Sequence, residues 1–321
     1  MPGPFIYSIL MSTQQVRLSH TDISMSSEEI WSRFPLAKLI DLPVEKSEGV
    51  LSSLYKTRVF PLALRHRIWS FFNKTNLDTH WLDQFNIYWT QILSGRPILG
   101  VLDFAYLHGV HREKFYQYGE AYDYMEDSHL DAWQQSEVLF QLINLVYRES
   151  QHSDTYKASM IKYAPSSGHI LEFGAAISPI TRSLHTFGIS TRTIYIADLP
   201  TYAFHYACFR WREKENIKPI VLLPENEFKL PANKQYGIIF CVEVFEHLPD
   251  PVTTIRMFYD LLLPDGILVF DYIKSDATGL DTSAGLEYRE QVLDFVRDNF
   301  TLVLGDLSDT SCTIGLTVVR K

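Results

Sequence analysis

The sequence predicts an α/β protein with a doubly wound, mostly parallel sheet of seven strands and an N-terminal helical cap. From about residue 165, short apolar strands alternate with helices, a pattern typical of parallel sheets covered on both faces. Residues 1–160 lack this alternation and place aromatic side chains at helical spacing instead. The strand at 170–173 ends in a glycine turn, and the next strand ends in an acid, as in sheets that bind nucleosides.

Length and charge limit the classes of protein to which this chain can belong. Its 321 residues suggest two domains, which we place at residues 1–160 and 161–321. The formal net charge is -9, and the sequence contains no basic stripe. Nucleic acids and anionic membrane surfaces are bound through clustered lysine and arginine, so the sequence argues against both as partners.

Cysteine usage and the N-terminus predict a cytoplasmic protein. Cys208, Cys241 and Cys312 are widely spaced, and no CxxC pair is present. This pattern suits a reducing compartment and argues against a zinc knuckle or a disulfide framework. The first residues have no basic leader, and no apolar run approaches the roughly 20 residues that span a bilayer.

The first half is predicted to be helical. Ser26 is a plausible helix start, and further helices are expected at 65–73, 78–93 and 134–147. The second half is predicted to form the sheet. Its strands are expected at 170–173, 193–197, 219–223, 236–242, 267–273, 301–304 and 312–319, and its helices at 179–187, 201–214, 251–263 and 286–300. Because most of these helices link successive strands, the sheet should be parallel until it closes in an antiparallel pair.

The carboxyl ends of the first three strands predict a nucleoside site. Gly174 permits a tight turn after the first strand, and Asp198 ends the second strand, where a carboxylate would accept both ribose hydroxyls. Leu199 follows this acid and could cover one face of an adenine. Glu225 follows the third strand and could meet the adenine amino group.

Four sequence blocks resemble the class I S-adenosylmethionine-dependent methyltransferases. They are LEFGAAISPIT, YIADLP, YGIIFCVEVFEHLPDP and LLLPDGILVFDY, in the order and at the spacing of that family. The resemblance covers residues 165–320 and implies a Rossmann-like methyltransferase fold with S-adenosyl-L-methionine as the cofactor. A nicotinamide cofactor is the rival interpretation, but it would favour a third glycine and does not explain the EVFEHLPDP run.

The resemblance also implies contacts with the cofactor. Glu172 would hold the methionine amino group, and Asp198 would bind the ribose diol. The other implied contacts are the turn residues Gly174, Ala175 and Ala176 and the carbonyl group of Cys241, near the methionine ammonium.

The turn departs from the usual family pattern, Gly-x-Gly-x-Gly. It reads Gly174-Ala175-Ala176-Ile177-Ser178, so two of the three glycines are replaced. The Cβ atom of Ala176 resists a positive φ angle. The altered turn motivates a second hypothesis, in which the chain keeps the fold as a non-catalytic binding or scaffolding module.

Glu243, Glu246 and His247 are the candidate catalytic residues, because the resemblance places them close to the transferred methyl group. His247 would be the general base, since imidazole titrates near neutral pH; alternatively it caps the next helix or packs under the cofactor. The main hypothesis, methyl transfer with His247 as the base, involves no metal ion. Two carboxylates and an imidazole can nevertheless ligate a divalent cation, which gives a third hypothesis of metal-assisted O-methylation.

Residues 116–127 combine four tyrosines with four acids, a composition that suits a cationic, amine, phenolic or amide acceptor. We assign Tyr118, Glu120 and Tyr122 to acceptor binding; the alternative is an interface that covers the sheet domain. The predicted activity is methyl transfer to nitrogen or oxygen of a small-molecule or peptide-like metabolite, with a homodimer as an open arrangement.

Overall fold

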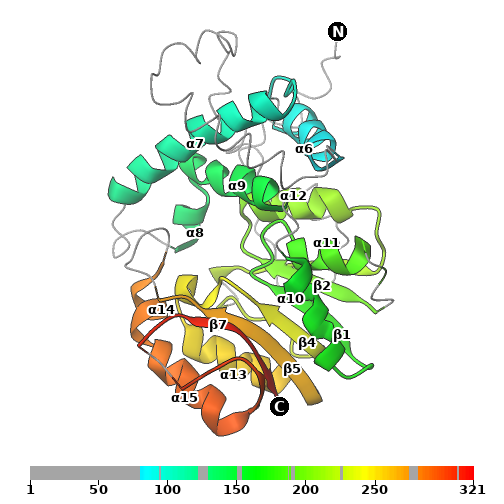
Figure 1. Cartoon of the computed structure of the whole chain (residues 1–321), viewed down its shortest axis with the longest axis vertical. Helices are drawn as coiled ribbons and strands as arrows, with labels where there is room; N and C mark the ends of the chain where they lie inside the picture. Colours follow the sequence, from blue (N-terminus) through cyan, green and yellow to red (C-terminus); the bar gives the residue numbers. More distant parts are fainter. Residues whose placement is uncertain are drawn as a thin grey trace.

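The computed structural model describes residues 80–93, 95–121, 129–149, 154–186, 188, 192–224, 227–274, 281–308 and 311–321. Seven strands in these ranges form one sheet in the order β3-β2-β1-β4-β5-β7-β6 (Figure 1). The strands are β1 (His169–Phe173), β2 (Ile194–Asp198), β3 (Ile217–Val221), β4 (Tyr236–Cys241), β5 (Leu262–Tyr272), β6 (Thr301–Leu304) and β7 (Ile314–Arg320). The first five are parallel, and β7 runs antiparallel to β5 and β6. The predicted fold class is confirmed.

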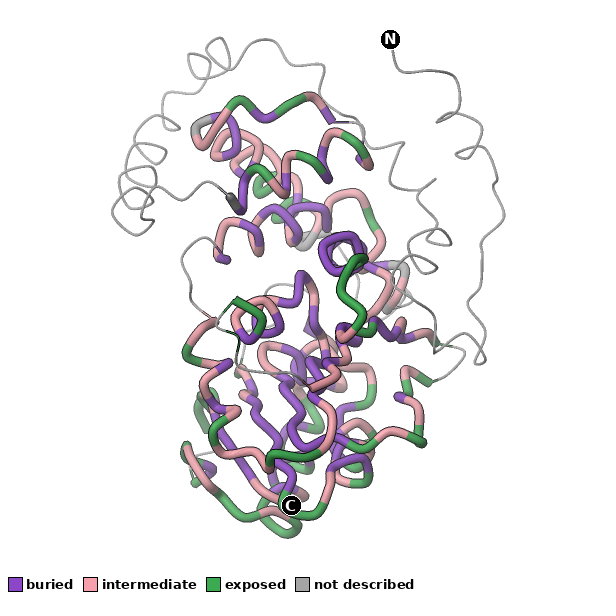
Figure 2. The backbone as a smooth tube through the Cα atoms, turned by 90° about the vertical axis from the view of Figure 1, so that its right-hand side faces the viewer, coloured by how far each residue is buried: buried purple, intermediate pink, exposed green. Residues whose placement is uncertain are grey.

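Helices cover both faces of the sheet and bury its apolar side chains. They are α11 (Pro179–Thr186), α12 (Tyr202–Trp211), α13 (Pro251–Leu261), α14 (Ser283–Glu287) and α15 (Arg289–Asn299). Phe258 of α13 and Val292 of α15 belong to the core on one face. Leu184 of α11 and Phe204 of α12 belong to the core on the other. The buried backbone that crosses the lower half of Figure 2 lies between these layers.

A layer of helices stands above the sheet and rests on α12 (Figure 1). It contains α6 (His80–Gln91), α7 (Val101–Ala121), α8 (His129–Trp133), the 3-10 turn η2 (Ser136–Val138) and α9 (Leu139–Glu149), and α10 (Thr155–Ala158) leads from it to the sheet. The Tyr88 hydroxyl of α6 lies 2.7 Å from His205 Nδ1 of α12. Phe85 packs edge-on against Tyr206. The helical spacing of aromatic residues in this part of the sequence therefore correctly predicted a buried helix face.

Several elements differ from their predicted bounds or were not predicted. The helix α7 was not predicted, because its sequence carries no continuous apolar face. The strand β5 begins at Leu262, inside the range predicted for the preceding helix, and the register between β4 and β5 shifts between Tyr236 and Ile238. The helix expected at 286–300 is divided at Tyr288 into α14 and α15.

Several predictions fall on residues that the structure does not describe. The helix start at Ser26 and the helix at 65–73 lie outside the described residues. The boundary between residues 160 and 161 therefore stays a prediction. Within the described ranges, no helix combines the length and the apolar character required to cross a membrane.

Candidate functional site

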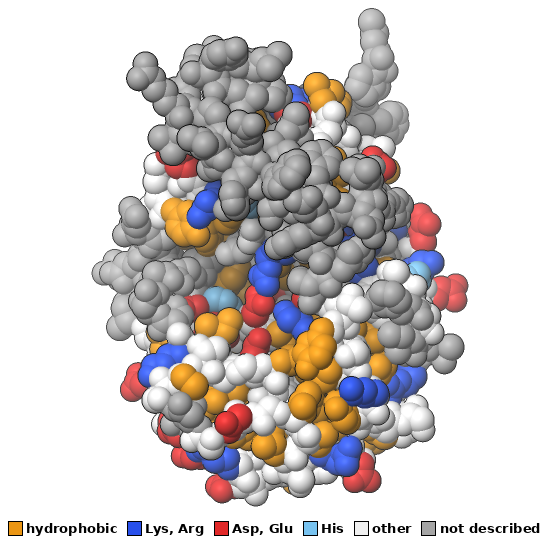
Figure 3. Space-filling view, viewed as in Figure 1, with side chains coloured by type: hydrophobic (Ala, Val, Ile, Leu, Met, Phe, Trp, Pro, Cys, Tyr) orange, Lys and Arg blue, Asp and Glu red, His pale blue; other side chains and the backbone are white. Residues whose placement is uncertain are grey.

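A cavity of about 940 Å³ lies between the helical layer and the carboxyl ends of β1, β2 and β4. Glu172, Asp198 and Val242 line it from the sheet, and Trp133 and Leu145 line it from the helical layer. Figure 3 shows acidic, basic and histidine side chains gathered across the middle of the molecule, between these two parts. Ligands of open α/β sheets bind at this edge, so the cavity is the candidate functional site.

The turn after β1 keeps a left-handed backbone at each of the three positions where the family has glycine. The φ angles are 64° at Gly174, 46° at Ala176 and 57° at Ser178. A Cβ atom on Gly174 would lie 2.3 Å from Val244 Cγ2, so glycine is required there. A left-handed conformation costs about 1–2 kcal/mol for a residue with a Cβ atom, and Ala176 and Ser178 both carry that strain.

Side chains of α12 hold this strained turn from outside the cavity. Trp211 Nε1 donates a 2.6 Å hydrogen bond to Ser178 Oγ. Arg210 Nη1 donates a 2.9 Å hydrogen bond to the Ile177 carbonyl oxygen. Arg210 is itself paired with Glu149 of α9 at 2.7 Å. Packing and hydrogen bonds thus maintain a conformation that glycine would adopt without strain.

Glu172 caps the helix that follows the turn. Its carboxylate accepts hydrogen bonds from the backbone N–H groups of Ile180 at 3.0 Å and Thr181 at 2.8 Å, and from the Thr181 hydroxyl at 2.5 Å. Burial raises the pKa of Glu172 to about 7, against the opposing effect of these donors. The side chain lines the cavity but is already bonded to α11, and its contact with a methionine amino group stays a prediction.

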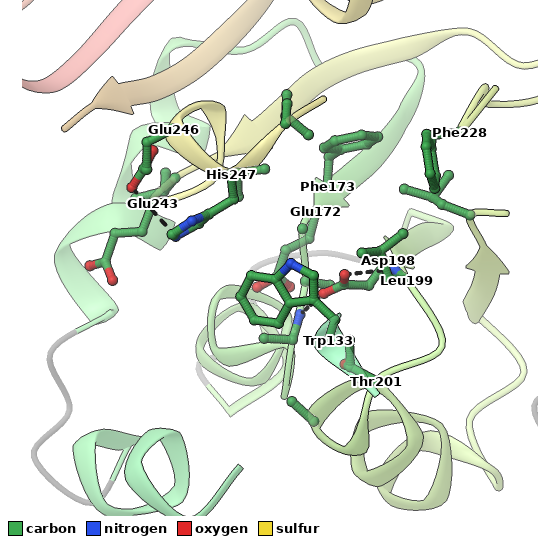
Figure 4. Close-up of a pocket in the computed structure, with 18 of the residues that line it drawn as sticks. Trp133, Glu172, Phe173, Asp198, Leu199, Thr201, Phe228, Glu243, Glu246 and His247 are labelled. Carbon is green, nitrogen blue, oxygen red and sulfur yellow. Dashed lines mark hydrogen bonds and ion pairs between the residues drawn. The ribbon is translucent and has the colours of Figure 1, made fainter. Parts of the chain in front are cut away.

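Asp198 lies at the end of β2, where the sequence predicted a ribose-binding acid. Its Oδ2 accepts from Ala176 N at 2.5 Å and its Oδ1 accepts from Leu199 N at 2.7 Å. Burial raises the pKa of Asp198 to about 6, while the two backbone donors and the charge of His247 act in the opposite direction. The carboxylate is fixed at the cavity wall by the turn itself (Figure 4).

An apolar slot extends from Asp198 along the cavity wall. Leu199 and Phe228 face this part of the cavity from neighbouring loops, and Leu222 and Met257 also line it (Figure 4). Flat apolar walls of this kind suit an aromatic base beside a ribose. Glu225, the residue predicted to meet the adenine, lies outside the described residues.

Cys241 does not line the cavity. Its side chain is fully buried in the core, opposite Phe173 and Phe270 in the sheet register. The cavity is lined instead by Val242 and Glu243, which follow the strand end. The contact implied for the Cys241 carbonyl group stays a prediction, because it concerns the backbone and not the buried side chain.

Glu243 is held by cations from the helical layer and is not free to act as a base. Arg148 of α9 makes a bidentate pair with its carboxylate at 2.8 and 2.9 Å, and Lys157 of α10 lies 3.2 Å away. Burial alone would raise the pKa of Glu243, but these two cations lower it to about 2. In this structure the Glu243 carboxylate joins α9 and α10 to the end of β4, and its catalytic role stays a prediction.

Glu246 and His247 do meet in the cavity, in the short turn η5 (Phe245–His247). His247 Nε2 lies 3.9 Å from Glu246 Oε1, and Figure 4 shows the Glu243 carboxylate turned away from this pair. The opposite ring nitrogen, Nδ1, lies 3.1 Å from Asp281 Oδ1. Burial raises the pKa of Glu246 to about 7, opposed by the charge of His247. A carboxylate on each side of the imidazole fixes its orientation.

One acceptor residue predicted from the tyrosine cluster, Tyr118, lies in the described part of the chain and is not among the residues that line the cavity. It packs on a small apolar cluster with Phe115, Val138 and Trp133, of which Val138 and Trp133 do line the cavity. Tyr122 and the side chain of Glu120 lie outside the described residues. The helical layer contributes Trp133 instead, whose ring lies 5.5 Å from His247 and nearly perpendicular to it.

The described residues offer no metal centre. No group of three His, Cys, Asp or Glu side chains in these ranges is arranged to hold a metal ion. The third carboxylate of the predicted set, on Glu243, is directed to Arg148 and Lys157. Metal-assisted O-methylation is therefore not proposed further.

Sequence reasoning missed several residues of the site. Phe228 could have been suspected as an aromatic residue after the third strand, and Asp281 as an isolated acid after the fifth. Trp133, Arg148 and Lys157 carry no local signal, because they reach the site only through the packing of the helical layer.

Part of this chain is similar to known methyltransferases. Residues 147–300 match the family model of a methyltransferase domain. Among curated proteins, a ubiquinone biosynthesis O-methyltransferase of Shewanella sp. (strain ANA-3) is 28% identical over 93 residues, which cover 26% of this chain and 39% of that protein. The chain thus matches well under half of the length of this relative.

Solved structures with a similar sheet include two of the N-methyltransferase NodS from Bradyrhizobium japonicum WM9. One is 20% identical with a TM-score of 0.41 and covers 54% of this chain and 95% of that chain. The complex with S-adenosyl-L-homocysteine is 19% identical with a TM-score of 0.39 and covers 64% and 98%. The glycopeptide N-methyltransferase MtfA is 12% identical with a TM-score of 0.37 and covers 53% and 92%.

Proposed function

We propose that the protein methylates nitrogen or oxygen of a small-molecule or peptide-like acceptor in the cavity above the sheet, with S-adenosyl-L-methionine as the methyl donor, since residues 147–300 match the model of a methyltransferase domain. The observation that carries the proposal is the retained geometry of the turn after β1. All three positions are left-handed although two of them carry a Cβ atom, and the Asp198 carboxylate is held in place by the turn. A scaffold without a ligand has no evident reason to keep this strain.

The residues present fit the cofactor. The close approach of Gly174 to Val244 leaves bare backbone at the point where the turn faces the cavity. Asp198 would accept the ribose hydroxyls, and Leu199 and Phe228 would enclose the adenine. Glu172 would act indirectly: by capping the start of α11, it would hold the turn in the position that faces the cofactor.

S-adenosyl-L-methionine supplies a methyl group on a positively charged sulfur, which an acceptor with a lone pair displaces in line. The protein must align that acceptor, exclude water and remove its proton. Trp133 and Leu145 of the helical layer line the cavity and would help to keep water from the reacting atoms when an acceptor is bound.

His247 is the proposed general base. An imidazole that donates from Nδ1 to Asp281 keeps the lone pair of Nε2 for a proton from the acceptor. Asp281 is thus a positioning residue that selects the useful tautomer, as a buried carboxylate does for a catalytic histidine elsewhere.

Titration calorimetry with S-adenosyl-L-methionine and S-adenosyl-L-homocysteine tests the proposal. Wild-type protein should bind both, and Asp198→Ala should lose at least about tenfold in affinity, the effect of removing a charged hydrogen-bond acceptor. Asp260→Asn, an exposed change on α13, is the matched control and should bind as wild type does. Absence of binding at millimolar ligand would favour the non-catalytic alternative.

A further inference from the structure

One face of α9 forms part of the cavity wall opposite the sheet. The residues of this face that line the cavity follow one another at helical spacing, from the end of η2 to the end of α9: Val138, Gln141, Leu145 and Arg148. Residues three and four apart lie on the same side of a helix. Another face of α9 packs in the core of the helical layer through Leu139, Leu142, Ile143 and Val146. This packing fixes which side chains of α9 meet a ligand.

Gln141 is a polar side chain in the middle of this wall. It is only partly buried, and it makes no hydrogen bond within the part of the chain that the structure describes. Neither atom of its carboxamide is sealed from solvent, so both are accessible at the cavity. Arg148, by contrast, is paired with Glu243. Gln141 therefore offers hydrogen bonds that the described residues do not use.

The neighbours of Gln141 along this wall are uncharged. Val138 and Leu145 flank it on α9, and Trp133 lines the same cavity. The charged residue of this face, Arg148, lies seven residues further along the helix, about 10 Å at 1.5 Å per residue. Small-molecule sites commonly combine apolar walls with a few polar groups that fix the orientation of the ligand.

A bound acceptor would displace water from the Gln141 carboxamide. A polar group that loses water without gaining a new partner opposes binding, and more strongly than a mismatch in apolar shape does. The carboxamide carries an oxygen that accepts and an NH₂ group that donates, side by side in one plane. A matching ligand therefore presents a donor and an acceptor side by side.

One residue of an extended peptide presents this pair of groups. The N–H and C=O groups of the same residue in a β-strand point to the same side and exchange two hydrogen bonds with one partner. An ester at the same position has no N–H group to donate, and an ionised carboxylate only accepts. The apolar neighbours Val138 and Leu145 offer a surface for the side chain of such a residue.

We propose that the methyl acceptor is peptide-like and that Gln141 binds the N–H and C=O groups of one of its residues in an extended conformation. The inference rests on the proposed methyltransferase function and names its substrate class. Gln141 Oε1 accepts from the N–H group, and Gln141 Nε2 donates to the carbonyl oxygen. Gln141 is a specificity residue, which neither gives nor takes a proton during the transfer.

A matched pair of probes tests the two hydrogen bonds. N-acetyl-L-phenylalanine N-methylamide has the N–H group, and O-acetyl-L-phenyllactic acid N-methylamide has an ester oxygen in its place. Calorimetry on protein saturated with S-adenosyl-L-homocysteine should show at least about tenfold tighter binding of the amide, the effect of leaving one buried polar group unpaired. Gln141→Leu should abolish this preference. Gln91→Leu, at an exposed glutamine of α6, is the matched control and should retain it.

A crystal structure of the complex tests the geometry. With S-adenosyl-L-homocysteine and the amide probe bound, the acetyl N–H group and the methylamide carbonyl oxygen should lie within hydrogen-bond distance of Gln141. A probe bound at another wall of the cavity overturns the inference. Equal affinities for amide and ester, or no binding of the amide at millimolar concentration, overturn it as well.

The two proposals fail in different ways. Gln141→Leu should bind S-adenosyl-L-homocysteine as wild type does, since the proposed cofactor contacts lie at the ends of β1 and β2. A loss of cofactor affinity in this variant would assign Gln141 to the cofactor and overturn the inference. A wild-type protein that binds no cofactor fails the proposed function. A protein that binds cofactor but does not distinguish the amide from the ester fails only the present inference.

Discussion

Arg210 of α12 donates a hydrogen bond of 2.9 Å to the carbonyl oxygen of Ile177, in the middle of the turn after β1. The same guanidinium makes two contacts of 2.7 Å with the Glu149 carboxylate of α9. Both side chains are almost fully buried. One buried ion pair therefore connects the helical layer to the turn that should carry the cofactor.

Removal of the Glu149 charge should damage both stability and binding. Glu149→Gln leaves Arg210 buried without its carboxylate, and we expect a loss of about 3–5 kcal/mol in unfolding free energy, measured by urea denaturation. The double variant Glu149→Met/Arg210→Met should recover part of that stability, because no fully buried charge remains unpaired; Arg182, which lies 3.4 Å from Glu149, is partly exposed. Its affinity for S-adenosyl-L-homocysteine should nevertheless stay below that of wild type, since the Ile177 carbonyl oxygen loses its hydrogen-bond donor. Wild-type affinity in the double variant would contradict a role of Arg210 in holding the turn.

Ala176→Gly should stabilise the protein. Glycine adopts a φ of 46° without the Cβ strain, and the relief exceeds its entropic cost, for a net gain of about 0.5–1 kcal/mol. Thermal unfolding measures the difference. Ala175→Gly is the control: Ala175 is fully buried outside the left-handed region, so that change should destabilise the protein. A destabilised Ala176→Gly would mean that the turn does not carry the strain described.

The ion pair of Glu243 predicts a pH dependence. The pKa of Glu243 falls from 4.5 to about 2 in the folded protein, so its pairing with Arg148 stabilises the fold fully above pH 4.5. The contribution disappears as the pH falls from 4.5 through 2, because the carboxylate is then protonated in both states. Urea denaturation of wild type and Glu243→Gln should therefore differ at pH 7 and converge toward pH 2. The exposed Glu213→Gln control should show no such trend.

Phe228→Ala should weaken the two cofactor forms equally. Its ring faces the apolar slot with Leu199, which we assign to the adenine common to S-adenosyl-L-methionine and S-adenosyl-L-homocysteine. Loss of one aromatic wall should reduce both affinities about tenfold in calorimetry. Tyr288→Ala, at an exposed ring, is the control. An effect on only one of the two ligands would place Phe228 near the methyl group instead.

Local sequence patterns were sufficient to predict the sheet and the residues of one wall of the cavity. Strand and helix periodicity, together with a glycine and an acid at strand ends, identified Gly174 and Asp198 correctly as residues of the cavity wall. Their positions depend on the strand to which each belongs, and the parallel order of β1 and β2 brings the two strand ends together.

The pattern failed where residues adjacent in sequence point in different directions. Glu243 and Glu246 were treated as one cluster with His247, but Glu243 adopts a φ of 58° and is directed to the helical layer. Tyr118 was assigned to the acceptor from composition alone, which cannot tell a ligand-binding ring from one that packs in a small cluster.

The sequence by itself determined the fold class, the turn after β1 and the acid at the end of β2, because these follow from neighbouring residues and from the fixed geometry of parallel strands. Only the tertiary structure decided which charged side chains meet in the cavity. Arg148 reaches Glu243 across 95 residues of sequence, and Asp281 reaches His247 from beyond β5. Such pairs form when separate helices and loops pack on the same sheet edge, and burial and the neighbouring charges then set the pKa of each carboxylate.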